Sequence, residues 1–421
     1  MKKIGAKYCS LLPIDITENT ARHFFARFWG REDVYAKRSV SKKTGKAGYF
    51  PQCDNLWHYG VCPKADKVKI QCGKCENQSY SKLGIAQIIG HLKGERADGS
   101  DVIGVYPLLP DDTCRFIVFD FDNHEKGAEE KDFANTDNEW KEEVDAVRTI
   151  CKEQGIDALT ERSRSGRGAH LWIFFAQKIP AGLARKFGFA LLDKGAETVN
   201  MKSFRYYDRM LPTQNHVLDG GIGNLIALPL QGQALREGNS AFIDENWNAY
   251  QDQWKVLMET KKLSKEKIEE CIKTWLPENP FEPGMENEEI RIKPWEYQRK
   301  FHSEDAMGSM KIVLSNLIYV DTKNLKYRLQ NQVRRLAAFL NPVYFKNQRI
   351  GYSNYLESRT IYMGQEEYGY IGIPRGQYDE LVKRCEEAGI HYHLEDKRTV
   401  GRRIDVTFQG ELRKSQIPAV K

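Results

Sequence analysis

The sequence predicts a catalytic core that mixes helices and strands, of the α/β or α+β class. A short apolar run at 116–121 ends in acidic residues, which is typical of a central strand. Two further strand-like runs, 158–162 and 170–175, are joined by a glycine-containing turn. Amphipathic helical patterns at 138–154 and 181–198 alternate with these strands. Strands and helices in this order favour a layered core of both element types.

Length and composition indicate a soluble protein of several domains. The 421 residues exceed what one compact core usually contains, so we expect two or three domains. Hydrophobic residues make up 41% and charged residues 29%, which excludes a disordered chain. The formal net charge of +6 is compatible with a nucleic-acid partner but is shared by many other enzymes. No apolar run approaches the roughly 20 residues that span a bilayer, so we expect no membrane association and a cytoplasmic location.

The N-terminal part contains two predicted helices. The first, at 17–29, has apolar residues at helical spacing and is followed by Gly30, a typical C-terminal cap. A basic polar loop at 37–46 precedes a group of cysteines. The second helix, at 81–92, ends near a further glycine, Gly94.

The remainder of the chain divides at a linker. The segment 246–275 is predicted to be largely helical, and 277–294 is rich in proline, glutamate and asparagine. Beyond the linker we predict a helix at 330–340 and a mixed α/β segment at 344–421. The domains we expect are an N-terminal helical region at 1–100 with a cysteine module at about 49–80, a catalytic core at 101–276, a linker and helical connector at 277–329, and a small α/β segment at 330–421.

Two acidic residues at the end of the first core strand are the most informative feature. Successive side chains on a strand alternate between its faces, so Asp120 and Asp122 share one face. Phe119 and Phe121 then point into the core. Two carboxylates on a rigid strand can hold the divalent cations of two-metal phosphoryl transfer. For an Asp-x-Asp pair alone, two acids at an exposed strand end are about as common as a metal site. The apolar strand before the pair makes the exposed strand end the less favoured explanation.

The turn at 163–168 carries polar groups suited to a phosphate. Its backbone N–H groups, the hydroxyl of Ser165, the guanidinium of Arg167 and the imidazole of His170 can face one anion. An ordinary hairpin turn and a core histidine are the simpler explanation of each part alone. The chain contains no G-x-x-x-x-G-K-[ST] phosphate loop.

Four clustered cysteines predict a structural zinc site. Cys53, Cys62, Cys72 and Cys75 can supply four thiolates, and the last two form a C-x-x-C pair. The first two are farther apart than in a usual zinc knuckle, and His58 could replace one thiolate. Four unpaired thiols are the alternative. The other cysteines are scattered and are expected to be buried thiols: Cys9, Cys114, Cys151, Cys271 and Cys385.

Four collinear motifs extend these observations. They occupy 104–112, 161–166, 207–214 and 220–231. Together with the Asp-x-Asp strand and His170, they make the first two-thirds of the chain resemble the archaeo-eukaryotic primases and primase–polymerases. The resemblance is closest to the primase domain of TOTE conflict systems, and it extends to the related CRISPR-associated primase–polymerases.

The resemblance implies an α+β, primase–polymerase (RRM-like) catalytic core with an N-terminal zinc-binding module. Asp120 and Asp122 correspond to the first motif, and Asp208 to the third, so these three would hold two catalytic Mg²⁺ or Mn²⁺ ions. Asp208 stands in a D-R-x-x-P-x-Q context and ranks above Asp219, which is more simply a turn residue.

The resemblance also assigns nucleotide contacts. Ser165 and His170 correspond to the second motif, although Ser163 could be its serine instead. His170, Ser165 and Arg167 would bind the β and γ phosphates. Weaker candidates for nucleotide or template contact are Arg205, Asn224 and Gln231.

The implied activity is that of a DNA-directed primase–polymerase. It would transfer NTPs or dNTPs onto a primer or an initiating nucleotide on a single-stranded DNA template. Implied partners are template, primer, nucleoside triphosphates and a helicase or other conflict-system proteins. The cysteine module would brace the fold, and could equally present aromatic and basic residues to nucleic acid: Trp57, Tyr59, Lys67, Lys69 and Lys74.

The C-terminal third resembles the segment that leads into a superfamily-two helicase in the same systems. The matching stretches are 336–340, 374–376, 404–406 and 410–416, and Gln416 stands where such helicases place an adenine-reading glutamine. No phosphate loop follows, so we predict no helicase activity and favour a small α/β accessory domain.

Two rival functions remain open from the sequence. A haloacid-dehalogenase-type phosphatase shares the strand that ends in Asp-x-Asp, but that family has Thr or Val where this chain has His124. The other rival is a zinc-stabilised nucleic-acid-binding protein without catalysis, which would bind nucleic acid but show no metal-dependent turnover.

Overall fold

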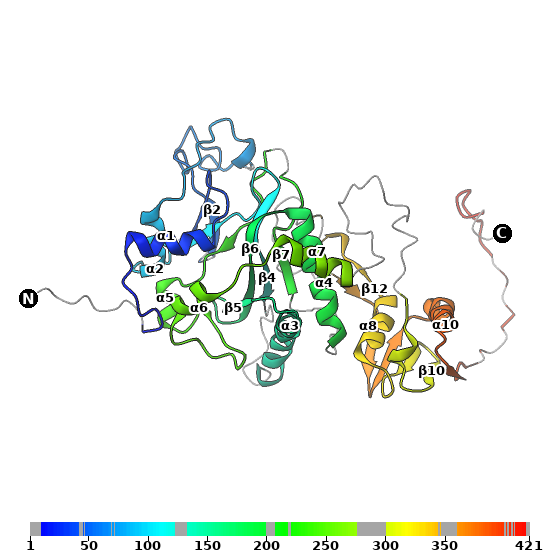
Figure 1. The fold of residues 1–421 in the computed structure, drawn as a ribbon. Coiled ribbons are helices and arrows are strands. Elements are labelled where there is room, and N and C mark those ends of the chain that lie inside the picture. Colours follow the sequence, from blue (N-terminus) through cyan, green and yellow to red (C-terminus); the bar gives the residue numbers. More distant parts are fainter. Residues whose placement is uncertain are drawn as a thin grey trace, which may run out of the picture.

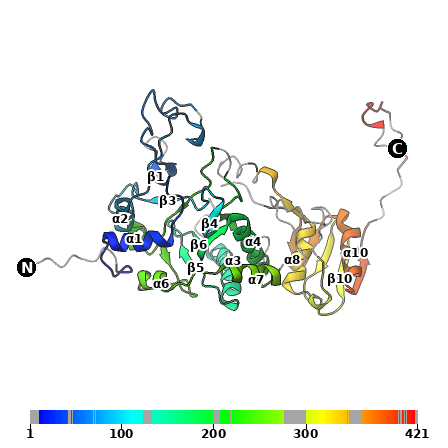
Figure 2. The same ribbon diagram turned by 45° about the horizontal axis from the view of Figure 1, so that its top comes forward.

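The chain folds into helices and several separate sheets, so the predicted mixed α+β fold is confirmed (Figures 1 and 2). The structure is a computed structural model. None of the helices in its described part is long and apolar enough to cross a membrane. It describes residues 10–41, 45, 47–68, 70, 72–122, 133–198, 207–217, 220–275, 300–343, 346, 360–399, 401, 404–405, 407 and 409–417.

A five-stranded sheet with strand order β7-β4-β6-β5-β9 forms the centre of the fold (Figure 1). All its neighbouring strands are antiparallel. The long central strands are built from near-continuous apolar runs, which is what burial on both faces requires. The strands are β4 (Thr113–Asp122), β5 (Leu159–Arg162), β6 (Gly168–Pro180), β7 (Tyr207–Leu211) and β9 (Ala241–Phe242).

Helices cover both faces of this sheet. One core contains Phe119 and Phe121 of β4 and residues of α3 (Phe133–Glu153), α4 (Ala181–Thr198) and α7 (Lys265–Trp275). The opposite core contains Phe116 and Val118 of β4. The helices that contribute to it are α1 (Glu18–Arg27), α2 (Ile85–Lys93), α5 (Gly232–Arg236) and α6 (Gln253–Glu259). Alternate residues of β4 therefore serve two different cores, as the strand pattern predicts.

Local signals explain where the first two helices begin and end. The Thr17 side chain accepts a hydrogen bond from the backbone N–H of Thr20 and caps α1. This helix ends before Phe28, so the expected Gly30 cap is wrong by two residues. Helix α2 begins later than predicted but ends at Gly94, which adopts the left-handed conformation typical of a C-terminal glycine.

A second, four-stranded sheet lies beside the N-terminal helices, with strand order β2-β1-β3-β8. The chain between β2 and α2 holds the four clustered cysteines and the short helix η1 (Cys72–Lys74), and it projects at the top of Figure 1. The strands are β1 (Ala36–Val40), β2 (Ala47–Pro51), β3 (Ile103–Val105) and β8 (Ile226–Ala227).

Two predicted helical segments are partly wrong. The segment 246–275 contains α6 and α7 separated by 260–264, where Leu263 forms a bridge to Phe175 instead of continuing a helix. The helix predicted at 330–340 is α8 (Tyr327–Leu336), and the residues after it form strand β12 (Ala338–Leu340) with β13 (Thr360–Tyr362). Apolar periodicity alone does not distinguish a helix end from a short strand.

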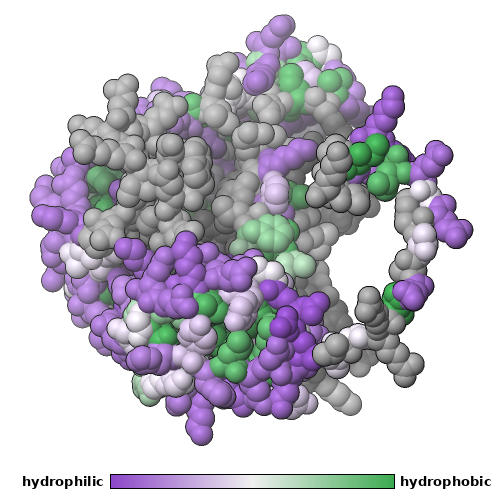
Figure 3. Space-filling model, turned by 90° about the vertical axis from the view of Figure 1, so that its right-hand side faces the viewer, coloured by the Kyte–Doolittle hydropathy of each residue, from purple (hydrophilic) through white to green (hydrophobic). Residues whose placement is uncertain are grey.

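The C-terminal part contains a further five-stranded sheet, of order β14-β15-β11-β10-β16. Two of its strands lie in 300–329, where we expected a helical connector; most of the expected linker lies outside the described residues. Helix α8 packs against α4 of the central core. Seen from the right-hand side of Figure 1, hydrophobic residues form small patches among hydrophilic ones (Figure 3). The elements are η2 (Ser303–Asp305), β10 (Met310–Leu314), β11 (Ile318–Asp321), β14 (Gln365–Glu367), β15 (Tyr370–Ile373), η3 (Arg375–Gln377), α10 (Tyr378–Glu387) and β16 (Tyr392–Asp396).

Candidate active site

Asp120 lies in the middle of the central sheet. On one side its strand pairs with β6, which places His170 opposite Asp120, and on the other side with β7, which places Arg209 opposite it. Residues paired across antiparallel strands point to the same face. Asp120 is only 8% exposed, so it is a buried carboxylate and not an acid at an open strand end. Asp122, two residues on, is partly exposed.

A bulge in β7 brings Asp208 to the same face. The register of β7 against β4 shifts between Asp120 and Phe121, which pair with Arg209 and Tyr207, so Asp208 is the extra residue. Tyr207 packs in the core against Phe121, whereas Asp208 and Arg209 are both only partly buried. A bulge of this kind re-aims a side chain and is common next to active sites.

Arg209 joins the two carboxylates. Its Nε lies 3.2 Å from Oδ2 of Asp120 and 3.5 Å from Oδ2 of Asp208. The structure therefore brings the first and third predicted motifs together around one cation. Arg209 was not among the predicted site residues, because its sequence position gives no signal until the bulge is known.

His170 is held between two carboxylates. Its Nδ1 lies 2.9 Å from Oε2 of Glu161, and its Nε2 lies 3.5 Å from Oδ1 of Asp120. Burial alone would lower the pKa of His170, but the charges of Glu161 and Asp120 hold it well above its usual range. Burial likewise opposes ionisation of Asp120, yet hydrogen bonding and the charges of His170 and Arg209 hold its pKa below the usual range. The site is therefore a charged network of imidazolium, guanidinium and carboxylates.

Glu161 anchors this network from strand β5. It is 1% exposed and accepts hydrogen bonds from the His170 ring, from the Trp172 indole at 3.0 Å and from the Ser240 hydroxyl at 3.2 Å. A buried carboxylate is tolerated only with such partners. The sequence analysis missed Glu161 as a site residue, although an acid inside an otherwise buried strand is a signal that could have been used.

The turn at 163–168 lies beside the acidic strand. Gly168 pairs with Asp122, and a Cβ at Gly168 would lie 2.3 Å from the carbonyl oxygen of Phe121, so only glycine permits this approach. The hydroxyls of Ser163 and Ser165 lie 3.1 Å apart, and the backbone N–H of Arg167 points to Oγ of Ser165 at 3.4 Å. Both serines lie in the same turn.

The family assignment follows from a match over this whole region. Residues 19–271 match the model of the TOTE conflict system, Archaeo-Eukaryotic Primase domain. The chain belongs to this family. Family membership supports a nucleotidyl-transfer function for this primase-family chain. The matched residues end before the C-terminal third, so its resemblance to a helicase-associated segment stays a prediction.

One solved structure similar to this primase-family chain is the polymerase domain of Mycobacterium tuberculosis ligase D in complex with DNA. The sequences are 12% identical, the TM-score is 0.31, and the alignment covers 66% of this chain and 96% of that one. At this level the similarity carries no argument about the site. A comparison with curated proteins finds no match.

The weaker nucleotide candidates have varied positions. Asn224 donates a hydrogen bond to the Thr213 hydroxyl at 2.6 Å, in the segment after β7. Gln231 is 1% exposed and caps α5 while donating to Asp101, so its amide is used inside the fold. Arg205 and Asp219 lie outside the described residues, as does His124, the position that bears on the phosphatase alternative.

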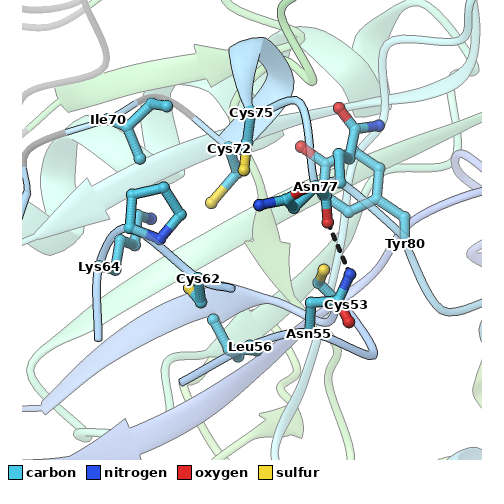
Figure 4. A pocket seen from close by; sticks show the side chains of 12 residues that line it. Cys53, Asn55, Leu56, Cys62, Lys64, Ile70, Cys72, Cys75, Asn77 and Tyr80 are labelled. Atoms are coloured by element: carbon cyan, nitrogen blue, oxygen red, sulfur yellow. Dashed lines mark hydrogen bonds between the residues drawn. The ribbon is translucent and has the colours of Figure 1, made fainter. Parts of the chain in front are cut away.

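The four clustered cysteines line one pocket (Figure 4). His58 is not among the lining residues. The backbone N–H of Ser79 points to Sγ of Cys53 at 3.4 Å. Burial opposes ionisation of Cys62, but several backbone hydrogen bonds together lower the pKa of its thiol. Within the described ranges, all thiols are free: Cys53, Cys62, Cys72, Cys75, Cys114, Cys151, Cys271 and Cys385, the last four of them buried.

The candidate metal ligands form no ready coordination group in the described residues. Over the part of the chain that the structure describes, no group of three or more His, Cys, Asp or Glu side chains is placed so that it could hold a metal ion. At the acidic site, the guanidinium of Arg209 lies against two of the three candidate carboxylates. Around the cysteine pocket, Trp57, Tyr59, Lys67 and Lys74 are exposed, and Lys69 lies outside the described residues.

Proposed function

We propose that this protein is a DNA-directed primase–polymerase that transfers NTPs or dNTPs onto a primer or an initiating nucleotide on a single-stranded template. The observation that carries the proposal is the meeting of the family's motifs on one sheet face. Asp120 on β4, His170 on β6 and Asp208 on β7 come from three adjacent strands. An ordinary hairpin or a decayed acidic pair gives no reason for a buried, mutually charged set of this kind.

The donor set suits divalent cations. Asp120, Asp122 and Asp208 supply carboxylate oxygens, the ligands that Mg²⁺ and Mn²⁺ prefer. The position of Arg209 supports this, since a positive charge already neutralises two of these carboxylates. We propose that the three aspartates hold the catalytic ions. Bound cations would lower the pKa of the attacking hydroxyl and offset charge on the triphosphate.

The chain's own cations would bind and orient the triphosphate. Glu161 fixes the His170 ring, so that the charged imidazole is preorganised before nucleotide arrives. Arg167 and Ser165 lie on the exposed rim of the same turn, where backbone N–H groups and the guanidinium can meet β and γ phosphates. These groups would stabilise the charge that accumulates on departing pyrophosphate. No side chain of the site needs to form a covalent intermediate.

We further propose that the cysteine module binds a structural zinc ion. Four thiols that line one pocket match the donor set of a closed tetrahedral site. The backbone hydrogen bonds that lower the pKa of Cys62 favour the thiolate that zinc requires.

A template-extension assay tests the function. Purified protein is incubated with single-stranded DNA template, labelled nucleotides and Mg²⁺ or Mn²⁺, with and without primer, beside Asp120→Ala/Asp122→Ala. Products from wild type alone support the proposal, and products in the lane without primer make the enzyme a primase. If the protein shifts template on a native gel but makes no product in either lane, the protein is a binding module and the proposal fails.

A further inference from the structure

A second irregularity in strand pairing, at the opposite end of β4, lies at a contact between an arginine and a tryptophan. The register of β4 against β6 shifts between Cys114 and Phe116, which pair with Ile179 and Phe174, so the single residue Arg115 faces four residues of β6 and the extra residues lie on β6. Cys114 packs in the core beneath α3 and α4, whereas Phe116 packs in the core beneath α1. Residues two apart on a regular strand share a face, so the alternation of β4 breaks at Arg115. The guanidinium of Arg115 lies over the Trp29 ring at 4.7 Å from the centroid.

Two hydrogen-bond donors at this contact have no acceptor in the part of the chain that the structure describes. Nε of Arg115 and Nε1 of Trp29 are both fully buried, and neither finds a partner among the described residues. Buried donors are almost always paired, and each one left unpaired costs about 1–3 kcal/mol. No acceptor among the described residues meets these two donors, and an oxygen of a bound ligand would satisfy them.

The surroundings are positively charged. Arg27 donates from Nη1 to the carbonyl of Thr260 at 2.8 Å, which holds the segment after α6 beside the C-terminal end of α1. This segment carries Lys262. Burial and the charges of Arg27 and Arg115 lower the pKa of Lys262. Within the described parts of the chain, no carboxylate forms an ion pair with any of these three cations.

We propose that Trp29, Arg115 and Lys262 form a binding site for a phosphate group, separate from the catalytic aspartates. The indole N–H, the guanidinium and the ammonium group are three donors that a phosphate oxygen can accept from at once. Arg115 and Asp120 are five residues apart on one strand, so the two sites lie about 17 Å apart.

The ligand that the geometry favours is a phosphodiester of a nucleic-acid strand. The Trp29 ring has Arg115 over it and the Phe25 ring 6.1 Å away, so it offers little room to stack the base of a free nucleotide. This choice of source rests on the proposed function, because a polymerase must hold its template and primer away from the reacting ends. At about 3.4 Å per nucleotide, a strand that reaches both sites spans roughly five nucleotides.

The test compares Arg115→Gln, Lys262→Gln and Trp29→Phe with Lys152→Gln, which removes an exposed charge that pairs with Glu245 elsewhere. Trp29→Phe keeps an aromatic ring and removes the indole donor, so it remains informative if Arg115→Gln folds poorly. Binding of a labelled single-stranded DNA is measured by fluorescence anisotropy over a range of salt, and binding of inorganic phosphate by calorimetry. All variants are also assayed for template extension.

The proposal expects weaker DNA binding by the three site variants, by about threefold to tenfold, and a salt dependence that is shallower by about 0.7 in log–log slope for the two charge variants. If DNA binding is unchanged but inorganic phosphate binding is lost in Arg115→Gln, the site stands with free phosphate as its ligand. If all variants match Lys152→Gln for both ligands, the proposal is overturned. If wild type makes no extension product but the site variants bind DNA more weakly than wild type, this site stands and the proposed function fails. If wild type makes product and the site variants bind DNA as well as wild type, the proposed function stands and this site fails.

Discussion

Nε of Arg209 lies 3.2 Å from the carboxylate of Asp120. The same guanidinium reaches Asp208, so one positive charge holds together two residues that a catalytic metal ion would bind. Because the guanidinium and the proposed metal ion would compete for the same oxygens, metal binding would require Arg209 to rearrange.

Replacing Arg209 by Gln is expected to strengthen the response to divalent metal. Without the internal cation, Asp120 and Asp208 repel each other, so the metal-free variant should unfold roughly 2–4 °C lower than wild type, and Mn²⁺ should restore more stability to it. Thermal unfolding with and without Mn²⁺ measures both effects. Arg209→Lys, which keeps the charge, serves as the control. An equal response to Mn²⁺ in all three proteins would contradict this role.

Asp208 and Asp219 can be distinguished by substitution. Asp208→Ala is expected to lower product formation on the order of 10³-fold or more, because the bulge of β7 aims this carboxylate at the face of Asp120. Asp219→Ala should remain near wild-type activity. Initial rates of primer extension at saturating nucleotide compare the two. The reverse order of the two losses would show that the third motif has been misassigned.

Glu161→Gln tests the buried anchor of His170. The amide keeps the size of the carboxylate but removes its charge, and its NH₂ group faces donors that now lack an acceptor. We expect a stability loss of about 1–3 kcal/mol and a rise in KM for nucleotide. Denaturant unfolding and steady-state kinetics measure these. Glu153→Gln, on the exposed end of α3, is the matched control, and a Glu161 variant as stable and active as this control would refute the anchoring role.

The site shows which features of its arrangement can be predicted from the sequence. Strand alternation predicts that Asp120 and Asp122 share a face while Phe119 and Phe121 enter the core, and this is confirmed. Alternation says nothing of which residue faces Asp120 across the sheet. That depends on register, and a single bulge decides it for Asp208 and Arg209.

The wrongly predicted helix boundaries also result from contacts between residues far apart in the sequence. The residues 338–340 form a strand because β13 pairs with them, and the paired residues lie 20 to 24 positions apart in the sequence. The break between α6 and α7 reflects the bridge of Leu263 to Phe175. Such contacts depend on the tertiary fold, and local apolar patterns do not encode them.

His91 makes stability depend on pH. The ring is fully buried: Nδ1 accepts from the backbone N–H of Ile103 at 3.1 Å, so Nε2 carries the proton and donates to the carbonyl of Pro229 at 3.0 Å. Burial lowers the pKa of His91 to about 4. The unfolded state binds this proton at about 6.5, so stability should fall as pH drops from about 6.5 to 4, by up to roughly 3 kcal/mol.

Denaturant unfolding at several pH values measures this effect. His91→Gln should be less stable at neutral pH but should lose less stability on acidification than wild type. Equal slopes for the two proteins would show that other groups control the acid response.

Zinc removal should separate the two proposed metal sites. Cys72→Ser/Cys75→Ser is expected to abolish zinc content, whereas Asp120→Ala should retain it. A Cβ at Gly73 would lie 1.4 Å from the carbonyl oxygen of Gly220, so the turn between these cysteines touches the segment that follows β7. Loss of zinc should therefore also reduce extension activity. Metal analysis of purified protein decides this, and zinc-free wild-type protein would rule out the site.

The most direct test of the central claim is single-nucleotide addition opposite each of the four template bases. We predict that wild type, with Mg²⁺ or Mn²⁺, adds the complementary nucleotide in each case, and that Asp120→Ala/Asp122→Ala adds none. Addition that ignores the template base, or that persists in the double variant, would contradict templated nucleotidyl transfer by these aspartates.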